Sequence, residues 1–211
     1  MKLGANKPRL RQYPDRYARL QIKQHLDKIM KYLLINEETE RLKFRKLENS
    51  DFETWLELFK DEYTTKMLGM DEYKTSNERC EKWFEWTFNR YENNLGGQNV
   101  LILKESNKLI GQCGLLAREV ENQFELEIAY SILPKYRMQG FAVESAKKCR
   151  DFAFEHNFHD RLVSIIVPEN ENSKNVALKN GMSFSRKIQY NNKEMDLFQV
   201  SKSEWKRSNL A

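Results

Sequence analysis

Residues 137–142, RMQGFA, combine a basic side chain with two small residues at the expected start of a helix. A helix N-terminus carries unpaired backbone N–H groups and a partial positive charge, which favour anions. The small Gly140 and Ala142 would let a phosphate come close to those N–H groups, and Lys135 and Arg137 add positive charge. The segment therefore indicates a diphosphate site, although a plain helix cap would show the same pattern.

Several segments, in the correct order along the chain, resemble the GNAT superfamily of N-acetyltransferases. The R-x-x-G-x-A pattern described above resembles the acyl-CoA signature of that family. Residues 168–182, PENENSKNVALKNGM, and residues 126–130, LEIAY, resemble the branch that acetylates the N-termini of ribosomal proteins, and so does TERLKFRKLENSDF at 39–52. The resemblance covers about residues 39–200 and offers no counterpart for residues 1–36.

The resemblance implies an α+β GNAT fold, whose mixed, mostly antiparallel central sheet is flanked by helices and splays between its fourth and fifth strands. Acetyl-CoA, the cosubstrate, would lie in the splay with its pyrophosphate over the amides of residues 138–143. Asn170 would hold the pantetheine amide, or would only cap a turn or helix. The implied cofactor-binding residues are Ser131, Ile132, Leu133, Arg137, Met138, Gln139, Gly140, Phe141, Ala142, Val143, Asn170 and Ser173.

Acyl transfer requires a neutral amine, yet alkyl amines are mostly protonated at neutral pH. Glu127 is the candidate catalytic base because it lies beside the acetyl position that the resemblance implies, and Glu125 on the same strand face is the alternate. A solvated or salt-bridged residue is the competing interpretation of Glu127. For the leaving thiolate, the branch uses a serine where Ser173 stands, and Tyr130 and Tyr136 are further candidates.

Apolar periodicity predicts the elements that would position these residues. The three strands expected between 100 and 133 are joined by short turns, which favours an antiparallel meander. Asn93-Asn94 and Gly96-Gly97, on either side of Leu95, predict a turn before the first of them. We expect strands over 41–47, 100–105, 109–117, 125–133, 161–167, 183–190 and 194–200, and helices over 15–34, 75–92, 140–156 and 171–180, besides one that follows residue 51.

Charge divides the chain into two predicted parts, a basic arm with an amphipathic helix over 1–36 and a GNAT acetyltransferase domain over 37–211. The first part holds nine Lys or Arg and two Asp, a charge of +7, whereas the whole chain carries +5. The basic part suggests a weak RNA contact, and its apolar helix face suggests a homodimer.

Composition narrows the remaining choices. No apolar run reaches the length of a membrane span, no signal peptide is recognisable, and three scattered cysteines and three histidines form no metal-site pattern, so we expect a cytoplasmic protein without membrane or metal. The predicted function is acetyl-CoA-dependent N-acetylation of a primary amine, such as a protein or peptide N-terminus of a ribosomal protein. The alternatives are a small-amine acetyltransferase, acting on a polyamine or an antibiotic, and a non-catalytic CoA- or RNA-binding protein.

Overall fold

The computed structural model describes residues 31–208. The predicted basic arm and most of the helix predicted over 15–34 lie outside these residues, so the division of the chain at residue 36 stays a prediction. Residues 31 and 32 form a turn and residues 33 and 34 have no regular secondary structure, so the predicted end of that helix is absent from residues 31–34. Leu33 and Leu34 are buried in the cores on opposite faces of the sheet, an arrangement that does not suit a helix, because consecutive side chains of a helix do not point in opposite directions.

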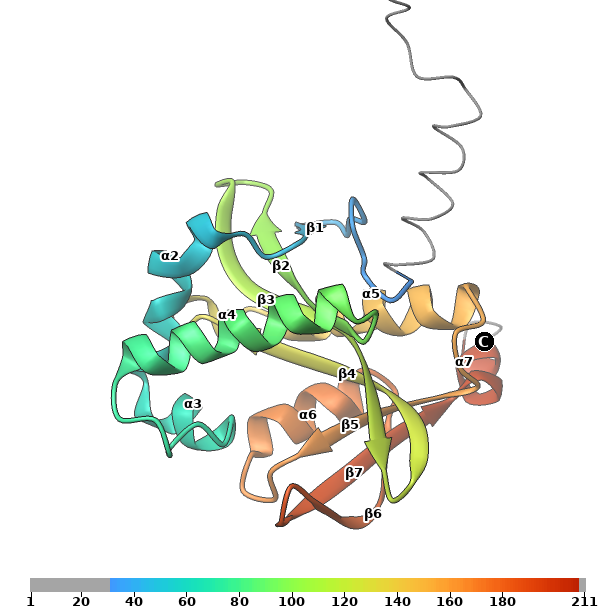
Figure 1. The fold of residues 1–211 in the computed structure, drawn as a ribbon. Helices are drawn as coiled ribbons and strands as arrows, with labels where there is room; N and C mark the ends of the chain where they lie inside the picture. Colours follow the sequence, from blue (N-terminus) through green and yellow to red (C-terminus); the bar gives the residue numbers. More distant parts are fainter. Residues whose placement is uncertain (1–30, 209–211) are drawn as a thin grey trace, which may run out of the picture.

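Seven strands form one mixed sheet in the order β1-β2-β3-β4-β5-β7-β6 (Figure 1). The strands are β1 Leu42–Arg45, β2 Gly96–Leu103, β3 Lys108–Val120, β4 Gln123–Ile132, β5 Arg161–Ile166, β6 Ser183–Tyr190 and β7 Lys193–Ser201. β4 and β5 are parallel, and the other neighbours are antiparallel. The predicted α+β fold with an antiparallel β2–β3–β4 meander is therefore confirmed.

Helices cover both faces of this sheet (Figure 1). They are α2 Phe52–Leu56, α3 Glu62–Met67, α4 Ser76–Glu92, α5 Phe141–Glu155, α6 Glu171–Lys179 and α7 Lys202–Ser208. α5 packs on one face through Ala146 and Cys149, and α2 and α4 pack on the other through Trp55 and Trp83. The sequence did not predict α3 or α7, because six or seven residues are too few to show a helical period. Within residues 31–208, no helix is both long and apolar enough to cross a membrane.

Of the turn predicted over 93–97, Asn93 and Asn94 do form a turn, whereas Gly96 and Gly97 already belong to β2. These glycines permit close packing: a Cβ at Gly97 would lie 2.6 Å from Cε1 of the Tyr91 ring. A glycine inside a strand commonly marks such an approach, so here the glycine pair belongs to the sheet and the turn precedes it.

The sheet opens between β4 and β5. Their parallel pairing comprises Leu126 with Leu162 and Glu127 with Val163, although β4 continues to Ile132. Where the backbone pairing ends, the Ser164 hydroxyl donates to the Ile128 carbonyl across the gap at 2.8 Å. The predicted splay between the fourth and fifth strands is therefore present, and it exposes the backbone of β4 beyond Glu127.

Candidate active site

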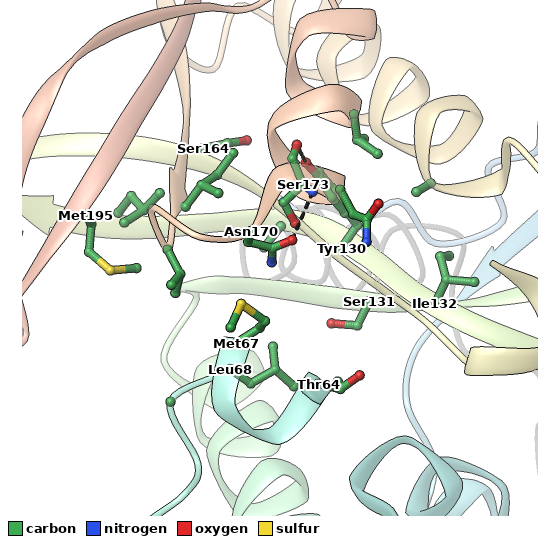
Figure 2. A pocket seen from close by; sticks show the side chains of 18 of the residues that line it. Thr64, Met67, Leu68, Tyr130, Ser131, Ile132, Ser164, Asn170, Ser173 and Met195 are labelled. Atoms are coloured by element: carbon green, nitrogen blue, oxygen red, sulfur yellow. Dashed lines mark hydrogen bonds between the residues drawn. The ribbon is translucent and has the colours of Figure 1, made fainter. Parts of the chain in front are cut away.

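A cleft of about 1430 Å³ occupies the splay. It is bounded by β4 and the end of β5, the starts of α5 and α6, the helix α3 and the β6–β7 hairpin. Figure 2 shows part of its lining from close by. Of the predicted site residues, those lining it are Glu127, Tyr130, Ser131, Ile132, Arg137, Met138, Gly140, Phe141, Ala142, Val143, Asn170 and Ser173. Leu133 and Gln139 do not line it; Leu133 is buried, and its N–H donates to the Ile110 carbonyl at 2.9 Å.

The segment before α5 has the geometry of an anion site. Met138 and Gly140 have φ of 61° and 85°, and Gly140 caps α5. Left-handed residues at a helix N-terminus turn successive N–H groups toward one point, which suits a phosphate. Arg137 supports this loop from within: its Nε donates to the Ile132 carbonyl at 3.0 Å, and its Nη1 lies 2.7 Å from Asp61 Oδ2. Because Asp61 pairs with it, Arg137 adds less free charge than the sequence suggested.

Arg41 is a basic residue that contacts this loop and that the sequence did not indicate. Its Nη1 donates to the Gln139 carbonyl at 3.1 Å and its Nε donates to Glu144 Oε2 at 2.6 Å, which joins the start of β1 to the start of α5. Burial opposes ionisation of Glu144, but hydrogen bonds from Thr39 and Arg41 outweigh it and lower its pKa. About one hundred residues separate Arg41 from Gln139, so no local pattern could have indicated the contact.

Glu127 lies on β4 at the inner end of the cleft and is 6% exposed. Its Oε2 accepts from Nε of Arg118 on β3 at 2.7 Å, so the salt-bridged interpretation of Glu127 describes the geometry. Burial lowers the pKa of Arg118, but Glu127 and the Tyr190 hydroxyl outweigh burial and raise it. Glu125 is paired in the same manner with Arg161 and does not line the cleft, which leaves Glu127 as the better placed carboxylate.

Tyr130, Asn170 and Ser173 meet across the splay (Figure 2). The Tyr130 hydroxyl donates to the Ser173 carbonyl at 2.8 Å, and Asn170 Oδ1 accepts from the Ser173 N–H at 3.1 Å. Asn170 therefore caps α6, as its competing interpretation held, while it also lines the cleft. Burial raises the pKa of Tyr130, which keeps its hydroxyl protonated.

The far half of the cleft contains residues that the sequence did not single out as site residues. Trp86 of α4, Arg118 of β3 and Tyr190 of β6 line it together with Gln98 of β2. The Arg118 guanidinium carbon lies 5.1 Å from the Trp86 ring centre and 6.0 Å from that of Tyr190. This half faces the inner end of β4 and is suited to hold the acceptor of an acyl group.

Comparisons with known proteins agree with this geometry. Residues 41–183 match the family described as the acetyltransferase (GNAT) domain, and the chain belongs to that family. The chain is 27% identical over 148 residues to the uncharacterized N-acetyltransferase p20 of Bacillus licheniformis, covering 70% of this chain and 81% of that protein.

Two solved structures share the fold and differ in acceptor. The ribosomal-protein alpha-N-acetyltransferase RimL in complex with coenzyme A superposes with a TM-score of 0.65 at 17% identity, covering 79% of this chain and 97% of that chain. The spermidine N-acetyltransferase of Vibrio cholerae, in complex with CoA and spermine, gives 0.62 at 16% identity, covering 79% and 99%. At such identities the comparison defines the fold, and the acceptor must be argued from the cleft.

Proposed function

We propose that this chain transfers the acetyl group of acetyl-CoA to the primary amine of a protein or peptide N-terminus, such as that of a ribosomal protein. The observation that carries the choice of acceptor is the charge of the cleft. The lysine, arginine, aspartate and glutamate residues that line it are Lys66, Asp71, Glu72, Arg118, Glu127, Arg137, Glu169, Lys179, Lys187, Lys193 and Glu194, six basic and five acidic. A site for a polycation would need an acidic excess. This balance favours an acceptor with one amine.

The near half of the cleft, between the start of α5 and the start of α6, is lined by residues that fit acetyl-CoA. The loop of Met138 and Gly140 directs N–H groups toward a diphosphate, and β4 beyond Glu127 offers backbone hydrogen bonds to an extended amide chain. Asn170 and Ser173 flank the same channel. Bound acetyl-CoA supplies an activated acyl group as a thioester.

Three residues of the chain serve the transfer. Glu127 accepts the proton of the acceptor amine, directly or through a water. The hydroxyls of Ser173 and Tyr130 are the donors for the leaving sulfur, and backbone N–H groups of β4 stabilise the oxyanion. Since the Tyr130 hydroxyl is bonded to the Ser173 carbonyl, it must turn from that bond before it can donate elsewhere.

The test measures acetyl-CoA binding by calorimetry and then turnover with a panel of peptides with free N-termini, spermidine and an aminoglycoside. We expect micromolar binding and faster acetylation of peptides at the α-amino group, located by mass spectrometry. Binding without peptide turnover, combined with rapid acetylation of a small amine, would refute the proposed acceptor and retain the enzyme class.

A contact of RNA or of a second subunit with residues 1–30 is part of the proposal that the described residues do not address. The nine Lys or Arg within residues 1–36 support an electrostatic approach of this segment to a ribosomal surface. A truncation that starts at residue 31 should keep turnover of short peptides while it loses any salt-dependent binding to ribosomes, which sedimentation would measure.

A further inference from the structure

The far half of the cleft holds more positive than negative charge close to Glu127. We call Trp86, Arg90, Arg118, Glu127 and Tyr190 the arginine–aromatic cluster. Arg90 and Arg118 lie 5.3 and 5.1 Å from the Trp86 ring centre, and Glu127 is the carboxylate bonded to Arg118. Arg90 donates to the backbone carbonyls of Leu95 and Ala117 and, among residues 31–208, pairs with no carboxylate. The cluster therefore carries two cations and one anion.

Burial makes this excess charge costly. Arg90 is 5% exposed, and burial, together with repulsion from Arg118, lowers its pKa to about 10. The side chains of Arg118 and Glu127 are 18% and 8% exposed. A buried, uncompensated charge is strongly unfavourable unless a partner arrives. An incoming anion would bring the cluster to neutrality.

Arg118 can receive that anion while it holds Glu127. A guanidinium has five N–H donors in a planar fork, and Arg118 gives Nε to Glu127. The side chain lies against Trp86 and Tyr190 and lines the cleft, so its position is fixed before the acceptor binds. Carboxylate and phosphate are the anions that match such a fork, and of these two a peptide acceptor supplies the carboxylate.

Gln98 adds an independent requirement for an N–H donor. It lines the cleft and is 6% exposed, and its Oε1 has no hydrogen-bond partner among the described residues. The register pairs Gln98 with Gly114 and Gly114 with Ala129, so Gln98 and Glu127 are on the same face of the sheet. A buried carbonyl oxygen left without a donor is unfavourable, and a backbone or amine N–H of the acceptor would satisfy it.

We infer that the acceptor carries a carboxylate close to its reacting amine, and that Arg118 binds this carboxylate while Gln98 accepts an N–H from the same molecule. The inference rests on the proposed function and narrows it to N-termini with an acidic residue among their first positions. The same chemistry could also come from the α-carboxylate of a free amino acid. A polyamine or a lysine-rich N-terminus would meet repulsion from Arg90 and Arg118.

The experiment compares three C-terminally amidated peptides that differ only in their second residue, which is Glu, Gln or Lys. For the wild-type protein we expect kcat/KM to be about tenfold higher for the Glu peptide than for the Gln peptide, the size of one charge-assisted hydrogen bond. The Lys peptide should be slowest. Free glutamate and its amide form a second arm, which separates an α-carboxylate from a side-chain carboxylate.

Two variants test whether Arg118 causes the preference for the Glu peptide. In Arg118→Gln the Glu and Gln peptides should be acetylated at similar rates, because the carboxylate has lost its partner. Arg186→Gln is the matched control. Arg186 lies on β6, outside the cleft, and forms an exposed pair with Glu121, so its replacement removes one positive charge and should keep the preference for the Glu peptide. If circular dichroism shows that Arg118→Gln does not fold, Arg118→Lys and the wild-type peptide series test instead whether Arg118 causes the preference for the Glu peptide.

The outcomes separate this inference from the proposed function. Equal turnover of the three peptides by the wild-type protein, or a preference for Lys, would overturn the inference and leave peptide acetylation standing. Preserved Glu preference in a folded Arg118→Gln would overturn the assignment to Arg118. No peptide turnover at all, with rapid acetylation of spermidine, would overturn both.

Discussion

Two glutamates on one strand provide a matched test of the catalytic base. Glu125 and Glu127 share a face of β4, and each is buried and paired with one arginine, Arg161 and Arg118 respectively. Only Glu127 lines the cleft. Replacing each by glutamine removes the charge and keeps the size, so the two variants differ mainly in whether the lost carboxylate faces the acceptor.

The expected loss of stability follows from the burial of each pair. Removing one partner of a buried ion pair costs about 3–5 kcal/mol when the other charge cannot reach water. A glutamine oxygen can still accept the arginine N–H, which reduces that cost. In Glu127→Gln, Arg118 stays 18% exposed beside Arg90, and we expect a loss of about 3 kcal/mol. In Glu125→Gln, the one-third exposed Arg161 can recover water, and we expect about 2 kcal/mol.

Turnover should separate the variants much further than stability does. Loss of a general base typically costs about 10²–10⁴ in rate, and we expect kcat of Glu127→Gln to fall within that range while Glu125→Gln stays within about threefold of the wild type. Denaturant unfolding gives the stabilities, and release of CoA thiol gives kcat. If both variants kept wild-type kcat, or if both lost it equally, the assignment of Glu127 as the base would be refuted.

Three further outcomes are expected. Gly140→Trp places a bulky side chain at φ 85° beside the anion loop, so calorimetry should show at least about a hundredfold weaker acetyl-CoA binding with unchanged circular dichroism; retained affinity would contradict the loop assignment. Tyr130→Phe deletes the hydroxyl bonded to the Ser173 carbonyl, and it should cost about 1 kcal/mol in unfolding experiments and about tenfold in kcat, whereas an unchanged kcat would exclude it as a proton donor. Burial raises the pKa of Cys80 to about 12 and that of Cys149 well above its usual value, so a disulfide reagent should label the folded chain slowly and all three cysteines rapidly in denaturant; fast labelling of the folded chain would show that the core opens.

Several residues that the sequence grouped together do line the cleft side by side, because they are local in the chain. Gly140 and Ala142 lie within one helical turn, and Asn170 and Ser173 lie within another, so spacing alone brings each set together. The splay followed from the resemblance. Leu133 and Gln139 were included because they fall within the same stretch, and the structure places them outside the lining.

The far half could not be predicted because it is assembled from distant elements. Trp86, Arg118 and Tyr190 belong to a helix and two strands separated by about 30 and 70 residues, and each has an ordinary position in its own element. A careful reading of the β3–β4 hairpin could have placed Arg118 on the face of Glu127, since the register pairs Arg118 with Glu125. The role of Trp86 required the packing of α4.

The short seam between β4 and β5 has a mechanical consequence. Between β4 and β5 the backbone ladder has only two residue pairs, and side-chain bonds of Ser164 to Ile128 and of Arg161 to Glu125 reinforce it. A ligand that lies along the open edge of β4 and touches α6 would add a reversible contact between the two parts of the protein. The cleft would then be most rigid while the ligand is bound.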